Sequence, residues 1–430
     1  MSLQKVCLIL VILLSTISLA SADGMIHVYD PDMQFWKLQK ENRQLCVVNY
    51  ENGFENMVLA VDVYNLDKKA VWIFPIPATP NNVTVDLIDG FPEFHGYDVK
   101  KRVDEKISIV FNAMRLSQIY TIPFVMFGMF SMSKSMEEVI IHKHVEKMGL
   151  TVELVTTENG STLYDYLINK GLNLPANSKS ILDDYVGKNY SFVISWISDF
   201  ERFERESVIG VYVAFPTNKI YFPLKPTSVY DELEIPILIY VIGYVTPKLY
   251  PEIEKDVQVN YFVQSHYSVP DQLSHLFNGK TKIKDLKYTK IKIYTPSKNL
   301  VEDLWIDCSI LIDVVLAEFV NNSAWVWGTM LFVLSSCLAS MFAGTIVFRK
   351  DNPDRKKFAL FGLWNFLSLI GFAFMTMFLK TKKLEPELEK LLESHAVVIW
   401  DDRKILFVFL FSVFFVILTL IFEVVLHYIF

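Results

Sequence analysis

The sequence predicts an α+β fold in which β-strands dominate, carried on a three-helix transmembrane anchor. Apolar residues make up 52% of the 430 residues and charged residues only 21%. Long charge-free runs lie near the two ends of the chain, whereas the middle carries short runs rich in Val, Ile, Tyr and Phe that are typical of strands. The net charge of −7 argues against a nucleic-acid partner, because neutralising phosphates requires a basic face.

The first 22 residues have the features of a secretory signal peptide. A single cation, Lys5, precedes the apolar stretch 6–19, and the small residues Ala20 and Ala22 follow it. This order of positive, apolar and small residues is that of a secretory signal peptide, and the two small residues stand at the positions that a signal peptidase reads. The alternative is an uncleaved first membrane helix, for which the run is short. Either interpretation sends the following residues across a membrane.

Residues 23–299 are expected to form one exported, β-rich domain. Several of its runs alternate apolar and polar residues, as half-buried strands do. Strands are expected at residues 44–50, 57–64, 70–76, 106–112, 139–145, 150–157, 192–197, 210–215, 235–243, 257–262 and 287–294.

Helices are expected to be fewer and short in this domain. Capping residues and terminal glycines delimit three of them, at residues 163–169, 179–186 and 270–277. A juxtamembrane helix is expected over residues 300–323. The apolar run 119–130 is too short to span a membrane, so a buried strand pair is expected there, with a membrane-dipping loop or a partner-binding flap as alternatives.

Three apolar runs without a polar face follow, at residues 324–348, 358–379 and 405–428. Each is long enough to cross about 30 Å of hydrocarbon as a helix. The cation-rich link 349–357 is expected in the cytoplasm. The link 380–404 is then outside, although it begins with cations. The chain is therefore expected to be a multi-pass protein of the cell membrane whose large N-terminal domain lies outside the cytoplasm.

Two features of the predicted spans each have two interpretations. Ser336, Ser340 and Gly344 place a small residue at every fourth position, a helix-packing seam that would face another subunit or the other spans of the same chain. Glu423 and His427 lie on one face near the end of the last span. We expect a hydrated pair at the cytoplasmic interface, with a proton or ion path as the alternative.

The element Trp72, Pro75, Pro77 combines an aromatic residue with two prolines at alternate positions. Proline cannot donate a backbone hydrogen bond, so these residues are expected at the end or edge of a strand with Trp72 in the core. The alternative is a rigid extended segment that presents Trp72 to a ligand.

Several segments together resemble a known family. They are residues 50–55, 72–77, 163–167, 171–175, 185–186, 190–193 and 220–224. In this order the segments resemble an uncharacterised family of exported bacterial and archaeal proteins, domain of unknown function 2330, over residues 24–267. The resemblance implies an exported domain, and it implies no activity or catalytic residue.

The chain carries no recognised catalytic or nucleotide-binding motif, and no cofactor is expected. The best metal candidate is the pair His142 and His144, which would face the same side of a strand. A third ligand is needed, for which His95 and His266 are the available guesses.

The sequence allows two kinds of covalent modification, a disulfide and N-linked glycans. Cys46 and Cys308 are the exported cysteines and would either form a disulfide or remain two buried thiols. Four Asn-x-Ser/Thr triplets are candidate glycosylation sites. They begin at Asn82, Asn159, Asn189 and Asn321.

The favoured function is a non-enzymatic, membrane-anchored surface protein whose exported domain binds a ligand or partner. Its expected partners are the lipid bilayer and a membrane protein or a second copy of the chain. A membrane-bound, metal-dependent hydrolase and an accessory subunit of a membrane transport complex are the alternatives.

Overall fold

The computed structural model describes most of the chain and divides it into two compact units. A β-sheet unit comes from Met1–Asp98 and His142–Leu311, and a helical unit from Val99–Ile141 and Ile312–Phe430. The residues described are 25–30, 35–38, 44–61, 70–118, 150–157, 159–169, 176–197, 209–230, 232–349, 354–379 and 402–430.

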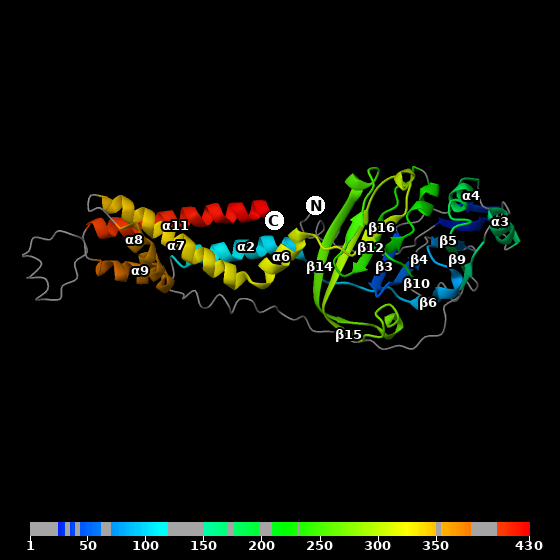
Figure 1. Ribbon diagram of the computed structural model, residues 1–430, viewed down its shortest axis with the longest axis horizontal. Coiled ribbons are helices and arrows are strands. Elements are labelled where there is room, and N and C mark those ends of the chain that lie inside the picture. Colours follow the sequence, from blue (N-terminus) through cyan, green and yellow to red (C-terminus); the bar gives the residue numbers. More distant parts are fainter. Residues whose placement is uncertain are drawn as a thin grey trace, which may run out of the picture. The chain divides into compact units, whose positions relative to one another are not determined.

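The described strands of the β-sheet unit form three sheets. Most of these strands are labelled in Figure 1. A five-stranded sheet has the order β2-β1-β5-β9-β8, an eight-stranded sheet β6-β10-β4-β3-β12-β15-β14-β7, and a three-stranded sheet β11-β16-β13. Pairing is antiparallel except between β3 and β12, which run parallel. The strands are β1 (Met25–Asp30), β2 (Phe35–Leu38), β3 (Gln44–Glu51), β4 (Phe54–Val61), β5 (Ala70–Ile76), β6 (Thr84–Asp89), β7 (Tyr97–Asp98), β8 (Leu150–Val155), β9 (Ser191–Ile197), β10 (Ile209–Pro216), β11 (Ile220–Phe222), β12 (Ile237–Ile242), β13 (Thr246–Lys248), β14 (Val257–Ser268), β15 (Lys282–Ile293) and β16 (Leu304–Asp307).

The core of this unit lies between the sheets, because strand residues alternate between two buried faces. Trp72 and Phe74 of β5 pack in a cluster with residues of all three sheets. Val71 and Ile73 face the other way, in a cluster with α3 (Gly160–Asn169) and with Leu182 of α4 (Ala176–Asp183). The prediction of an α+β, β-dominated fold is confirmed.

A partly buried carboxylate, Asp303, joins several elements of the β-sheet unit. One carboxylate oxygen accepts from the hydroxyl of Tyr185 and the backbone N–H of Lys225, both at 3.0 Å. The other accepts from the hydroxyl of Tyr221 on β11, also at 3.0 Å. Burial raises the pKa of Asp303, and these three donors oppose the rise because they stabilise the charged form.

The helical unit contains the three apolar segments that the sequence predicts. By length and composition Ala324–Val347, Arg355–Met377 and Asp402–Ile429 could each cross a membrane. The second is not one continuous helix, since a 3-10 stretch separates its two halves. The elements are α2 (Val99–Leu116), α6 (Ile312–Asn322), α7 (Ala324–Val347), α8 (Arg355–Phe361), η8 (Gly362–Leu367), α9 (Ser368–Met377) and α11 (Asp402–Ile429).

Two local predictions are wrong. Residues 106–112, expected as a strand, lie inside helix α2. The buried residues of α2 recur every three or four positions, so a single apolar stripe runs along the whole helix. They are Val99, Val103, Ile107, Val110, Phe111 and Met114. The juxtamembrane helix begins only at Ile312, because residues 304–307 pair as β16 with β11 and β13.

The other expected elements differ mainly at their boundaries. Strand β5 has the predicted bounds, and the expected helix 270–277 is a short 3-10 helix, η5 (Asp271–Leu273), followed by turns. The expected strand 139–145 and the apolar run 119–130 lie outside the described residues.

Replacement of Asp303 by Ala should destabilise the β-sheet unit by about 3 kcal/mol, because two partly buried tyrosine hydroxyls and one N–H lose their acceptor. Chemical unfolding of the full chain in detergent micelles measures the change. Glu252→Ala, which removes an exposed carboxylate, should change the free energy of unfolding by less than about 0.5 kcal/mol. Equal effects of the two substitutions would contradict the role of Asp303.

Candidate functional site

A surface groove of about 660 Å³ lies in the β-sheet unit, where the β3–β4 turn meets the three-stranded sheet. The turn residues Asn52 and Gly53 both have positive φ, 56° and 80°, as a two-residue hairpin turn requires. The backbone N–H of Thr217 donates to the Gly53 carbonyl at 2.9 Å and fixes the neighbouring loop. The lining residues include Gly53, Pro77, Pro216, Thr217, Asn218, Lys219, Lys248 and Trp305.

The groove combines aromatic surface with positive charge. The Trp305 ring packs on Tyr221 with centroids 5.0 Å apart. Phe54, beside the turn, is 51% exposed. The Lys219 Nζ lies 2.9 Å from one carboxylate oxygen of Asp307, and the Lys248 Nζ lies 3.8 Å from the other. Because two ammonium groups share one carboxylate, this corner of the groove carries an excess of positive charge.

The hydrogen bond from Lys219 lowers the pKa of Asp307, and the charges of Lys219 and Lys248 add to this effect. Asp307 therefore stays ionised and holds the two lysines in place at neutral pH. All three side chains are 36% exposed or more, so an incoming anion can reach the ammonium groups.

A fully buried carboxyl, Glu55, lies on β4 close to this turn. Its Oε2 accepts from the backbone N–H of Tyr221 at 2.8 Å, while its Oε1 has no hydrogen-bond partner among the described residues. Burial raises the pKa of Glu55 well above its ordinary value of 4.5, and the Tyr221 N–H opposes this. Burial therefore disfavours the charged form of this carboxyl in the folded protein.

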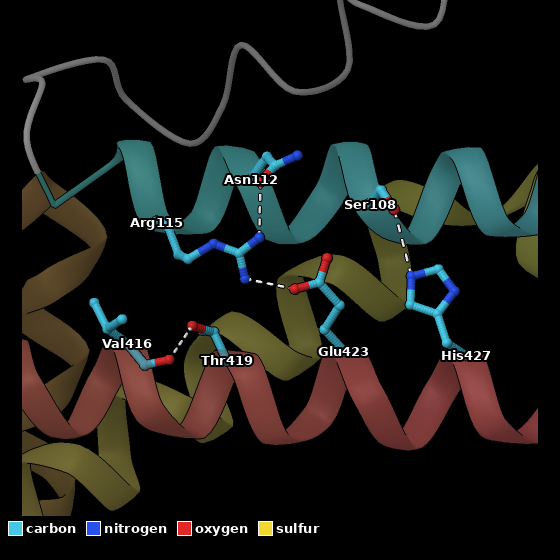
Figure 2. A network of polar contacts seen from close by, with 7 residues as sticks. All are labelled: Ser108, Asn112, Arg115, Val416, Thr419, Glu423 and His427. Atoms are coloured by element: carbon cyan, nitrogen blue, oxygen red, sulfur yellow. Dashed lines mark hydrogen bonds and ion pairs between the residues drawn. The ribbon is translucent and has the colours of Figure 1, made fainter.

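A second group of polar contacts lies in the helical unit, between α2 and the C-terminal part of α11 (Figure 2). The Arg115 guanidinium lies 2.6 Å from the Glu423 carboxylate and also donates to the Asn112 side chain at 2.7 Å. His427 lies 3.1 Å from Asp104 through Nδ1 and 3.3 Å from the Ser108 hydroxyl through Nε2. We name this group of residues the α2–α11 contact.

The α2–α11 contact is completed by packing against α6 and α7. Lys100 forms an ion pair with Asp313 at 2.5 Å, and the Asn321 side chain donates to the Val99 carbonyl at 2.9 Å. Gly328 leaves room for Val110, whose methyl carbon lies 3.0 Å from the position a Cβ would take. The sequence indicates Glu423 and His427 but not their partners on α2, because the alternation of apolar and polar residues in 106–112 predicts a strand.

In the element Trp72, Pro75, Pro77, the tryptophan lies in the core, as the sequence predicts. Trp72 is 1% exposed, and it packs in the main cluster of the β-sheet unit. Pro75 pairs with Phe192 of β9, and the pairing of the described residues of β1 with β5 covers only Ala70 to Ile73. Pro77 follows the strand and lines the groove.

The other predicted site residues are dispersed. Cys46 is buried in β3 and Cys308 is exposed after β16, and the structure joins neither in a disulfide. His142 and His144 lie outside the described residues; His95 and His266 lie within them, where no group of three or more His, Cys, Asp or Glu residues could hold a metal ion.

The four candidate glycosylation sites differ in exposure. Asn82 and Asn189 are exposed on the β-sheet unit. Asn159 is exposed but accepts hydrogen bonds from the backbone N–H and hydroxyl of Ser161 at the start of α3. The Asn321 amide is held by its bond to the Val99 carbonyl, so a glycan there would disrupt the helical unit.

The small-residue seam of α7 contacts segments of the same chain. The ring of Phe358 on α8 packs against Gly344, where a Cβ would overlap it, and the Ser336 hydroxyl accepts from the Asn365 side chain of η8 at 2.9 Å. Ser340 is buried between them.

Comparisons with known proteins give little further information. No protein-family model and no curated protein match the chain, so the resemblance to domain of unknown function 2330 stays a prediction. The crystal structure of baculovirus P35 matches with 14% identity and a TM-score of 0.27, over 62% of this chain and 96% of that chain. A mutated P35 after caspase cleavage matches with 11% identity and a TM-score of 0.28, over 62% and 100%. Such low TM-scores carry no conclusion about fold or function.

Replacement of Arg115 by Ala should destabilise the helical unit by about 2 kcal/mol. The side chains of Arg115 and Glu423 are only 21% and 15% exposed, so the pair lies between a surface pair and a buried one. Unfolding in detergent micelles measures this, with the exposed Glu105→Ala on the same helix as control. The exchange Arg115→Glu with Glu423→Arg should restore part of the loss, and no restoration would argue against a direct pair.

Replacement of Glu55 by Gln should stabilise the protein increasingly as pH rises. A raised carboxyl pKa contributes stability that is present below 4.5 and is lost as pH rises through the folded-state pKa. Gln cannot ionise, so the difference in free energy of unfolding between the variant and the natural chain should grow in favour of Gln between pH 4.5 and 8. A difference that does not change with pH would show that Glu55 is not held neutral.

Proposed function

We propose that this chain is a non-enzymatic binding protein of the cell membrane, with its β-sheet unit outside the cytoplasm and its helical unit as the anchor. The three apolar segments support the membrane anchor. The N-terminal segment of the sequence, with the features of a signal peptide, supports the location of the β-sheet unit.

The ligand that best fits the groove is an acidic polypeptide segment of a partner protein. The groove offers an ammonium pair on one carboxylate, a Trp305 ring and apolar walls from Pro77 and Pro216. Aromatic anchors with a charged neighbour are typical of protein interfaces. An acidic side chain would pair with the excess positive charge while an apolar neighbour contacts Trp305.

The observation that carries this proposal is the shared Asp307 carboxylate between Lys219 and Lys248. A solvated lysine alone is common on any surface. Here two lysines contact one carboxylate beside an indole ring, so Asp307 neutralises only one of the two positive charges and holds both side chains in place. A ligand carboxylate can therefore bind the lysines without the entropic cost of ordering them.

The full chain in detergent micelles, tested on an array of 12-residue peptides, should bind those that combine Asp or Glu with an aromatic residue. The double variant Lys219→Glu, Lys248→Glu should weaken this binding by about tenfold or more, since it reverses the local charge. Binding should also weaken as salt increases.

The matched control is Lys282→Glu, Lys284→Glu, which makes the same change of charge at exposed positions of β15 that do not line the groove. Its binding should equal that of the natural chain. Equal losses in both double variants would show a general charge effect, and no selective binding by the natural chain would reject the acidic ligand.

A further inference from the structure

We propose that residues 355–377 form a re-entrant hairpin, which enters and leaves the membrane on one side. The C-terminal end of α11 then lies on the same side as the β-sheet unit, and the end of α7, both ends of the hairpin and the start of α11 lie on the opposite side. This reverses the expectation that residues 380–404 are outside and that Glu423 and His427 are cytoplasmic. The inference rests on the proposed membrane anchor.

Both ends of the middle segment lie at one end of the helical unit. Two adjacent residues at the start of α11 show this. Arg403 donates to the carbonyl of Val347, the last residue of α7, at 3.3 Å. Lys404 donates to the carbonyl of Met377, the last residue of α9, at 2.9 Å. Since α8 begins shortly after α7 ends, the start of α8, the end of α9 and the start of α11 lie together.

Neither half of the middle segment is long enough to cross a bilayer. Helix α8 has 7 residues and α9 has 10, which correspond to about 10 Å and 15 Å at 1.5 Å per residue. A bilayer core requires about 30 Å. At the junction of the halves, Ser368 ends the 3-10 stretch with a positive φ of 73°, so the regular helix is interrupted there.

The two halves pack as the limbs of a hairpin around α11. Phe372 of α9 stacks on Phe411 at a centroid distance of 3.8 Å and lies 5.4 Å from Phe361 of α8. Phe407 contacts both Phe361 and Phe372. Figure 1 shows α8 and α9 beside the N-terminal half of α11.

The turn of the hairpin lies against the middle of α7. Gly362 is so close to this helix that a Cβ would lie 2.3 Å from the Ser336 carbonyl oxygen. Asn365 is fully buried and donates to Ser336. Irregular backbone at membrane depth is tolerated where protein covers it, and α7 provides this cover.

The distribution of cations supports the same arrangement. No Lys or Arg occurs between residues 299 and 348 or after residue 404. A re-entrant hairpin places every cation between residues 349 and 404 on one side, as the positive-inside rule favours, whereas a full span would divide them. The cations are Arg349, Lys350, Arg355, Lys356, Lys357, Lys380, Lys382, Lys383, Lys390, Arg403 and Lys404.

The connections of the chain supply an independent argument. Helix α2 follows β7 directly at Val99, and α6 follows the β-sheet unit at Ile312. Seven of the 18 residues of α2 are charged, six of them between Lys100 and Lys106, so the N-terminal part of α2 does not lie in hydrocarbon. Because α2 contacts Glu423 and His427, the C-terminal end of α11 must lie on the side from which α2 arrives.

A thiol-labelling experiment on sealed, right-side-out vesicles tests the inference with a membrane-impermeant maleimide. The exposed native Cys308 reports on the β-sheet unit. A Cys308→Ser chain gives the background labelling. Three further chains each add one cysteine to it, in place of Lys356, Lys382 or Tyr428, and the side chain of Tyr428 is 92% exposed. Each chain is labelled before and after detergent is added.

Cys308 and the cysteine at 428 should label in intact vesicles, and those at 356 and 382 only after detergent. A protected cysteine at 428 with labelled Cys308 and a labelled cysteine at 382 would overturn the hairpin. If Cys308 and the cysteine at 428 are both protected while those at 356 and 382 label, the hairpin stands and the proposed outside location of the β-sheet unit fails.

Discussion

The contact between α2 and α11 is the constraint on which the arrangement of the helical unit depends. Helix α2 carries seven charged residues, yet its apolar stripe is buried against the anchor helices. The ion pair Arg115–Glu423 and the contact of His427 with Asp104 hold it at a defined height on α11. A segment from the first third of the chain is thereby attached to the C-terminal helix.

The anchor also has to satisfy its backbone hydrogen bonds without water. Helices α7 and α11 do so internally, and the turn between α8 and α9 does so by lying against α7. The small residues of α7 make this close approach feasible. Gly344 leaves room for the Phe358 ring, and the Ser336 hydroxyl accepts a hydrogen bond from Asn365. The seam that the sequence shows therefore serves contacts within one chain.

The elements that could be predicted from the sequence are those whose pattern is complete within a short window. Successive side chains of β5 point to alternate buried faces along the strand. The three apolar segments, of 23 to 28 residues, are much longer than a typical strand. Helix α2 was mistaken for a strand because Ile107 and Ile109 alternate with polar neighbours. Only the spacing from Val99 to Met114 reveals the helical period.

The candidate site was beyond sequence reasoning for a different reason. Lys219, Lys248 and Trp305 are far apart in the chain, and the register of β16 with β11 and β13 brings them together. Hydropathy likewise cannot distinguish a span from two half-length helices of the same composition. The available signals were Gly362, Asn365 and the cations that follow residue 379.

The most direct test of the α2–α11 contact is chemical cross-linking in native membranes. Cysteines replace Ser108 and His427 in a chain whose other cysteines are changed to Ser, and a short bismaleimide is added. The contact predicts efficient intramolecular cross-linking of this pair, well above that of a control pair at Glu105 and His427, since Glu105 is exposed on α2. Equal yields for the two pairs, or none, would show that α2 does not lie on α11.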